Sequence, residues 1–380
     1  MPMQTAPGPT ERLPATDLLD PQDPLNPGHL DRMLTEIGLW QHGRGDQPDP
    51  RHGYSIDDEA RGLIVGLRDW RRGVRPPFSE RLARTCFGFI ESAAITEGPA
   101  AGRFHNFCDR RGRWLDSVGS DDSFGRTVWG LGVAHAADAP LAPRARADAL
   151  LRRSLPAADA LNPWYLRAHA FVIFGLAACR LDDARLRRLA DVLAGSYEAR
   201  ADERWRWFED GMTYCNARLP QALFAAARLF PEETRYARIA AEALDFLLEK
   251  TRNAQGSYDP VGNARLTTRG WFLRSDSAPA RFDQQPVDAG ALVECCAEAW
   301  HATGEPRFRQ AARDAFRWYG GANVHGLPVY DARTGGVSDA LTPDGLNSNQ
   351  GAESVLSVHL AHQALQTLEK TSEQGDTPRP

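Results

Sequence analysis

Two kinds of helical segment alternate along this chain of 380 residues. Segments of the first kind are rich in small residues and apolar on most faces, as in "TVWGLGVAHAA" (127–137) and "SVLSVHLAHQAL" (354–365). Segments of the second kind are amphipathic and rich in arginine, as in "RARADALLRRSL" (144–155) and "PRFRQAARDAFRWYG" (306–320). A helix that is apolar all round is buried, whereas an amphipathic helix covers a buried layer. The alternation therefore predicts an all-α (α/α)6 toroid, a closed ring of about six hairpins with inner and outer helices. A solenoid of helix pairs is the other arrangement, and the absence of a fixed short repeat disfavours it.

The hydrophobic periodicity predicts about twelve helices. They are expected near 28–40, 55–70, 78–96, 122–137, 143–157, 163–180, 183–198, 212–230, 232–250, 286–303, 305–319 and 350–369. Three long connections, about 97–121, 251–285 and 320–349, carry glycines, aspartates, aromatic residues and short strand-like pieces. Long loops on a helical scaffold are usually functional or disordered, and these contain too many aromatic residues for disorder. We expect short β-hairpins in them.

The domain organisation expected from this pattern is simple. Residues 1–27 are rich in proline and polar residues and are expected to be mobile, and 371–380 are expected to be a disordered tail. Residues 28–370 are expected to form a single (α/α)6 barrel domain.

Composition excludes several classes of function. The net charge is -5 and the pI is about 6.1, which gives no general attraction to nucleic acid or to an anionic membrane. None of the six cysteines forms a CxxC pair, so we expect a reducing compartment, no disulfide framework and no metal site. The first residues lack the apolar core of a signal peptide, and no run approaches the roughly 18 apolar residues that a membrane span needs. A cytoplasmic protein without a cofactor is expected.

One short pattern recurs at the start of inner-type helices. In "DDEARGLIVGL" (57–67) and "DSFGRTVWGLG" (122–132), an aspartate is followed by a small residue at +3 and an arginine at +4. A weaker echo is "YCNARLPQAL" (214–223), in which Tyr214 replaces the aspartate. A helix cap explains any single instance, because aspartate suits the helix dipole and pairs with an arginine four residues on. The recurrence on inner helices favours a shared function.

Alternate helices of a toroid point the same way, so all inner N-termini are expected to meet at one end of the ring. Polar starts of the inner helices would then converge on one concave pocket, the default site of a fold of this kind. The acidic residues expected there are Asp57, Asp58, Asp121, Asp122, Glu209, Asp210, Asp288 and Glu353. Beside them we expect the substrate-binding residues Arg61, Arg126, Trp207, Tyr214, Asn216, Arg218, Gln285, Asn349 and Gln350.

Carboxylates and tryptophans together suit a carbohydrate ligand. Aromatic faces pack on sugar rings, although ordinary core packing explains any one tryptophan equally well. Glycoside hydrolysis needs one protonated and one ionised carboxyl group across the scissile bond, and crowded carboxylates supply both states. We expect Asp122 and Asp210 to be the acid/base pair, with Asp58 and Glu209 as substitutes. The remaining residues would bind substrate, Asp57 and Asp121 among them.

Five motifs carry a resemblance to known proteins: "SIDDEARGLIV", "GSDDSFGRTVWGLG", "WFEDGMTYCNARLPQAL", "QPVDAGALVE" and "GGVSDALTPDGLNSNQGAESVLS". With them the chain resembles the six-hairpin glycosidase-like superfamily, and more narrowly a bacterial family often encoded near, or fused to, glycosyltransferases. The resemblance implies an (α/α)6 fold and, if the protein hydrolyses sugars, an inverting two-carboxylate mechanism. Where the family pattern has an aspartate, this chain has Cys215, which argues against catalysis at that position.

Three functions stay open at this point. The first is a glycoside hydrolase acting on an oligosaccharide or polysaccharide fragment. The second is a sugar isomerase or epimerase, for which His105 and His325 in the long loops are the candidate bases. The third is a non-catalytic glycan-binding partner of a glycosyltransferase.

Overall fold

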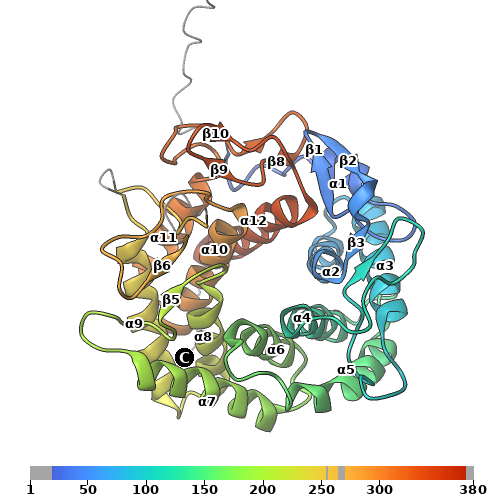
Figure 1. Ribbon diagram of the computed structural model, residues 1–380, viewed down its shortest axis with the longest axis horizontal. Helices are drawn as coiled ribbons and strands as arrows, with labels where there is room; N and C mark the ends of the chain where they lie inside the picture. Colours follow the sequence, from blue (N-terminus) through green and yellow to red (C-terminus); the bar gives the residue numbers. More distant parts are fainter. Residues whose placement is uncertain (1–18, 254–255, 264–269, 374–380) are drawn as a thin grey trace, which may run out of the picture.

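A computed structural model describes residues 19–253, 256–263 and 270–373 (Figure 1). Residues 1–18 and 374–380, which belong to the two segments expected to be mobile, lie outside the described residues. No helix in the described part combines the length and apolar character that crossing a membrane requires.

Six helices form the inner ring, each in contact with the next, and the last contacts the first to close it (Figure 1). They are α2 (Ile56–Arg71), α4 (Asp121–Ala137), α6 (Leu166–Cys179), α8 (Arg218–Leu229), α10 (Pro286–Thr303) and α12 (Ala352–Glu373). Outside them lie α3 (Pro76–Ala93), α5 (Arg144–Ala158), α7 (Asp183–Arg200), α9 (Thr234–Lys250) and α11 (Pro306–Arg317). The short α1 (Gly28–Met33) packs on α12 and completes the sixth hairpin. The predicted (α/α)6 toroid and its assignment of inner and outer helices are confirmed.

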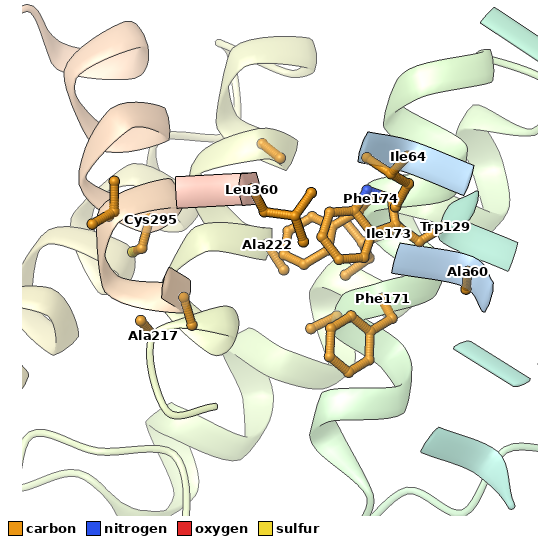
Figure 2. Packing of buried hydrophobic residues seen from close by; sticks show 14 of the residues in the cluster. Ala60, Ile64, Trp129, Phe171, Ile173, Phe174, Ala217, Ala222, Cys295 and Leu360 are labelled. Atoms are coloured by element: carbon orange, nitrogen blue, oxygen red, sulfur yellow. The ribbon is translucent and has the colours of Figure 1, made fainter. Parts of the chain in front are cut away.

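Small residues on the inner helices allow close approach of their backbones. A Cβ on Gly132 of α4 would lie 2.2 Å from the carbonyl oxygen of Gly175 on α6, and a Cβ on Gly175 would lie 2.4 Å from that of Val128. Alanine at either position would force the two helices apart, because protein interiors are close-packed. Apolar side chains such as Trp129 and Leu360 fill the middle of the ring (Figure 2). The glycine-rich pattern in the sequence is therefore a packing requirement.

Short antiparallel strand pairs connect the loops between helices. The pairs are β1 (His42–Arg44) with β2 (Gln47–Asp49), β3 (Tyr54–Ser55) with β4 (Phe107–Cys108), β5 (Gly211–Met212) with β6 (Phe272–Leu273), β7 (Tyr330–Asp331) with β8 (Gly336–Val337), and β9 (Leu341–Thr342) with β10 (Gly345–Leu346). A single 3-10 turn, η1 (Pro50–His52), follows β2. The β3–β4 and β5–β6 pairs each join loops that precede different inner helices. Of the three long connections, 320–349 holds the expected hairpins, β7–β8 and β9–β10, whereas β4 and β6 in the other two pair with strands from different loops.

Two predicted helix boundaries were wrong. The first helix ends at Met33 instead of continuing to residue 40, because the chain turns so that the Leu39 N–H reaches the buried carboxylate of Glu59. The helix predicted from residue 212 begins at Arg218, because residues 211–212 pair with β6 instead. Within the part of the N-terminal segment that the structure describes, Leu25 is buried, and the carbonyl oxygen of Asp23 lies 2.9 Å from Nε2 of His362 on α12.

Candidate active site

The first turn of α2 brings two aspartates to one end of the ring. The Ser55 hydroxyl caps this helix and accepts the N–H of Asp57 at 3.2 Å. Arg61, one turn on, donates to Asp58 Oδ1 at 3.1 Å and to Glu353 Oε2 of α12 at 2.5 Å. The Oδ1 atom of Asp57 is buried without a hydrogen-bond partner in the described structure. One carboxyl group of the pair is therefore tied to an arginine, while the other keeps an oxygen free.

The first turn of α4 repeats the motif with a different pairing. Asp122 Oδ2 accepts from Nε of Arg126 at 2.8 Å, and its Oδ1 accepts from the Tyr214 hydroxyl at 3.1 Å. The Arg126 guanidinium lies over the Phe171 ring, 4.1 Å from its centre. The preceding Asp121 bonds instead to Arg103, at 2.8 Å. The two motifs are thus not equivalent. In α4 the arginine pairs with Asp122, whereas in α2 it pairs with Asp58 and not with Asp57, the residue aligned with Asp122.

Arg167, in the first turn of α6, organises the loop before α8. Its Nη1 contacts both Glu209 oxygens, at 3.1 and 2.8 Å, and its Nη2 donates to Asn216 Oδ1 at 3.2 Å. Its Nε donates to the Tyr214 carbonyl oxygen at 2.5 Å. Cys215 stands between these residues with a φ of 47°, in the left-handed region that side chains other than glycine rarely adopt. The arginine therefore fixes the loop that delivers the Tyr214 hydroxyl to Asp122.

Asp288 and Glu353 complete this end of the ring. Asp288, in the first turn of α10, is 6% exposed and is hydrogen-bonded by the backbone of Asn216 and Cys215. Glu353, in the first turn of α12, is partly exposed beside Arg61. A cleft of about 210 Å³ opens here. Its lining residues are Gln41, His42, Ser55, Asp57, Asp58, Arg61, Gln285, Asp339, Gly351, Glu353 and Ser354.

Burial shifts three of these carboxyl groups toward their protonated form. It raises the pKa of Asp57 to about 6, with the charges of Arg126 and Arg61 opposing the shift. It raises the pKa of Asp58 to about 8 and that of Asp288 to about 7, again against nearby arginines. Desolvation disfavours the charged form of any buried acid, which accounts for the common direction.

Asp122 shifts the other way. Burial raises its pKa, but the charge of Arg126 and the hydrogen bonds from Arg126 and Tyr214 outweigh that effect, so the net pKa lies below its usual value. Asp57 and Asp122 are close enough for their charges to interact. Neighbouring carboxyl groups with opposite shifts can supply a proton donor and an ionised base at the same pH.

Several predicted site residues lie elsewhere. Asp210 is exposed on the loop before β5, where its backbone oxygen accepts the N–H of Arg274 at 2.9 Å. Arg218 points into the ring and pairs with Glu294 at 2.6 Å. Trp207, predicted to bind substrate, is 0% exposed and packs against Phe208, because the loop before β5 turns inward over α7.

The loop before α12 also departs from expectation. Asn349 is exposed and bridges to Arg44 and Gly45 through its backbone. Gln350 is held by backbone hydrogen bonds from His29 and to Gly43, with its side chain against the Gly336 backbone. Gln285, by contrast, lines the cleft, and its role in substrate binding stays a prediction.

Sequence reasoning missed four residues of this region: Arg167, His42, Gln41 and Asp339. Asp339 accepts from the Gly351 N–H and the Ser354 hydroxyl, both at 2.7 Å, and lies within the motif "GGVSDALTPDGLNSNQGAESVLS". Arg167 stands in the first turn of an inner helix, a signal that could have identified it. His42 and Gln41 precede the first inner helix by more than ten residues, and nothing in their local pattern marks them.

The histidines expected to serve an isomerase lie outside the cleft. His105 stacks on Trp114, and its Nδ1 lies 2.8 Å from the Asp116 carbonyl oxygen. His325 stacks on Phe282, and its Nε2 lies 2.8 Å from the Thr342 carbonyl oxygen. Among the histidines that the structure describes, His42 is the one that lines the cleft.

This chain resembles known proteins in its fold and not in its sequence. No protein-family model matches the sequence, and a search of curated proteins finds no match. A sugar epimerase from a ruminal bacterium superposes with a TM-score of 0.68 at 12% sequence identity, covering 90% of this chain and 95% of that chain. Cellobiose 2-epimerase from Spirochaeta thermophila gives 0.67 at 13% identity, over 92% of this chain and 94% of that one. An inactive variant of an α-1,6-mannanase from Salegentibacter gives 0.57 at 10% identity, over 90% and 96%.

At these identities the likeness establishes architecture and not chemistry. The chain has the (α/α)6 toroid fold that these sugar-acting enzymes share.

Proposed function

We propose that the cleft at the inner N-termini is the active site of an enzyme that acts on sugars, and specifically of a glycoside hydrolase. The observation that carries the proposal is the neighbouring Asp57 and Asp122, whose pKa values shift in opposite directions. Hydrolysis of a glycosidic bond requires this division, with one carboxyl group protonated and the other ionised. Membership of the bacterial family that the sequence motifs resemble stays a prediction, and so does a glycosyltransferase partner.

Asp57 is the candidate general acid. Its pKa of about 6 leaves about half of the molecules protonated at pH 6 and roughly a tenth at pH 7, and the residue lines the cleft. Asp122 is the candidate base, held ionised and oriented by Arg126 and Tyr214. In an inverting mechanism it would remove a proton from the attacking water while Asp57 protonates the leaving group.

Asp122 lies beside the cleft and not among its lining residues, and the residues that line the cleft around Asp57 suit sugar hydroxyl groups. Asp58, Arg61 and Glu353 form a connected set of donors and acceptors on α2 and α12. Gln285 adds an amide from the residue that precedes α10. A cleft of about 210 Å³ is smaller than a typical drug-sized pocket, which favours a single sugar ring at the reacting position.

The structural neighbours support the broader part of the proposal. All three are sugar-acting enzymes by name, and the mannanase variant is inactive with two neighbouring aspartates replaced by alanine. The present chain places two Asp-Asp pairs, 57–58 and 121–122, in the first turns of adjacent inner helices.

A sugar epimerase or isomerase is the second candidate. The two epimerases superpose with higher TM-scores than the mannanase, and His42 lines the cleft. Burial lowers the pKa of His42, so its ring is neutral at pH 7 and can accept a proton from a sugar carbon. Asp57, which lines the same cleft, would be the second acid/base group.

The experiment is an oligosaccharide panel read by mass spectrometry and by NMR of the anomeric proton. Hydrolysis adds water and, for this mechanism, inverts the anomeric configuration, whereas epimerisation conserves mass. Asp57→Asn and Asp122→Asn are expected to abolish turnover, and Asp210→Asn serves as the matched control on an exposed loop. Full activity in both of the first two variants would overturn the assignment. If Asp210→Asn instead abolishes turnover, Asp210 on the loop before β5 would be the general acid. Binding without turnover by the wild-type protein, measured by calorimetry, would favour a glycan-binding module.

A further inference from the structure

A second cavity lies toward the opposite end of the ring, among the C-terminal halves of α2, α10 and α12 and beside the first half of α8. Its volume is about 550 Å³. It is lined by Arg68, Arg71 and Arg72 at the end of α2, by Glu294, Ala297, Glu298 and His301 of α10, by Gln363, Ala364 and Thr367 of α12, and by Gln221 of α8. Arg71 follows Asp58 by thirteen residues of the same helix, which places the two cavities about 20 Å apart.

The apolar middle of the ring separates the two ends. Ile64, Phe174 and Leu360 lie between them, and all three are buried (Figure 2). A ligand in the second cavity would therefore not touch the acidic cleft. The two sites are independent in structure.

Positive charge is in excess at this cavity. Glu294 is paired with two arginines, Arg218 at 2.6 Å and Arg68 at 3.3 Å. Glu298 is paired with Arg228 at 2.7 Å. Each carboxylate of the lining therefore already has a cationic partner.

Two further arginines keep their charge for a ligand. Arg72 donates to neutral acceptors, Gln366 Oε1 at 2.7 Å and the Gln363 carbonyl oxygen at 3.0 Å. Arg71 is exposed and makes no ion pair with any residue that the structure describes. Burial lowers the pKa of Arg72, and the nearby charge of Asp69 offsets this in part. Arginines at the end of a helix also complement its dipole, but that effect needs no cavity.

A buried acceptor in the same wall lacks a partner. Gln363 is 2% exposed, and its Nε2 donates to the Val65 carbonyl oxygen at 3.1 Å and to Asp69 Oδ1 at 2.7 Å. These two acceptors fix the orientation of the amide, and they leave its Oε1 buried without a hydrogen bond in the described structure. An unsatisfied buried acceptor is costly, so a ligand that donates a hydroxyl proton would stabilise it.

We propose that this second cavity binds a sugar phosphate, with the phosphate on Arg71 and Arg72 and a sugar hydroxyl on Gln363. Guanidinium groups bind phosphate through paired N–H donors, and the volume accommodates a phosphorylated monosaccharide. The proposal does not rest on the reaction at the acidic cleft.

Calorimetry with glucose 6-phosphate, inorganic phosphate and glucose tests it on the full chain. Glucose 6-phosphate is expected to bind more tightly than either part alone, and more weakly as salt is added. Arg71→Gln is expected to weaken it roughly tenfold, and Arg71→Gln with Arg72→Gln to weaken it further, because each removes a charged hydrogen-bond donor. Arg84→Gln, which removes an exposed arginine of α3, is the matched control and should leave binding unchanged.

Two control measurements separate a loss of binding at this cavity from unfolding and from binding at the acidic cleft. The Arg71 side chain is exposed and forms no hydrogen bond or ion pair with the described residues, so its variant is expected to keep the thermal midpoint of the parent. Asp57→Asn, at the other end of the ring, should leave glucose 6-phosphate binding intact. The proposal is overturned if glucose 6-phosphate binds no better than inorganic phosphate, if Arg71→Gln binds as the parent does, or if Asp57→Asn abolishes binding.

Discussion

The two ends of the inner ring carry the same kinds of residue in opposite arrangements. At the N-terminal end, the arginines are fully engaged, while Asp57 keeps a carboxyl oxygen without a partner. At the C-terminal end, the carboxylates that line the cavity are paired, while Arg71 and Arg72 form no ion pair with a carboxylate in the described part of the chain. The helix dipole accounts for the sign at each end, because acids suit N-termini and bases suit C-termini. It does not account for groups that stay unpaired, and these are where we expect ligands.

The acidic end should show the largest effect. Asp122→Asn and Asp57→Asn are each expected to lower kcat by about 10³-fold on a glycan that the protein turns over, since each removes one half of the acid/base pair. The thermal midpoint serves as the control for folding. A loss of activity below tenfold in both variants would show that the unpaired acids of this end are not catalytic.

At the C-terminal end of the ring, substitutions of the paired carboxylates should change the free energy of unfolding most. Glu294→Gln leaves the buried Arg218 guanidinium without a charged partner, so we expect a loss of about 3–5 kcal/mol in the free energy of unfolding. Glu298→Gln removes a carboxylate whose partner Arg228 is half exposed, and should cost below about 1 kcal/mol. Urea denaturation of the two variants measures the difference. Equal losses would contradict the distinction between a buried and a surface pair.

The raised pKa of Asp288 predicts a pH dependence of stability. In the folded chain this carboxyl holds its proton up to a pKa of about 7, whereas in the unfolded chain its pKa is the ordinary 3.8. The contribution of Asp288 to the free energy of unfolding is therefore greatest below about pH 4 and falls as pH rises toward 7. Asp288→Asn removes this loss and should gain on the order of 1–3 kcal/mol relative to the parent between pH 5 and pH 8. An unchanged difference across that range would place the carboxylate in a solvated or well-paired setting.

The catalytic pH profile sharpens the role of Asp57. Because the acid must carry its proton, kcat/KM is expected to decline as pH rises through about 6, the pKa that burial gives this carboxyl. The opposing limb, set by the ionisation of Asp122, should lie below pH 4, since its pKa is lowered from 3.8. Activity that rises steadily from pH 5 to 8 would argue for a neutral histidine base such as His42, and so for an epimerase.

The smallest expected effect concerns the caps that orient the acidic turns. Ser120 accepts the N–H of Ser123 at 3.1 Å and so begins α4 just before Asp122. Ser120→Ala should cost about 1 kcal/mol in the free energy of unfolding. Ser92→Ala, within α3, is the matched control and should stay within about 0.5 kcal/mol. A cost equal to that of the control would show that the cap does not hold this turn.

The architecture followed from the sequence because it rests on local patterns. Small apolar faces and amphipathic faces alternate, and each inner helix could be identified by its composition, as the close contact of Gly132 with Gly175 explains. The loops were less predictable. Whether Trp207 faces a sugar or the core depends on how the chain turns before β5, and no periodicity encodes that turn.

The site was predictable in outline and not in its pairings. Acids at inner N-termini followed from helix direction, which is a property of the fold. The partner of each arginine did not, because Arg61 crosses to Glu353 on α12 and Arg218 crosses to Glu294 on α10. Contacts between residues far apart in the chain decide which carboxylate is left free, and a single sequence does not contain them.

The central claim is that the acidic cleft cleaves glycosidic bonds. Its most direct measurement is the mass of the products formed from an oligosaccharide panel in water enriched in heavy oxygen, with the Asp57→Asn and Asp122→Asn variants run beside the parent. The account predicts that the parent releases sugars that contain the heavy oxygen at the anomeric carbon, and that both variants release none. Products of unchanged mass, or labelled products from both variants at the parent's rate, would contradict it.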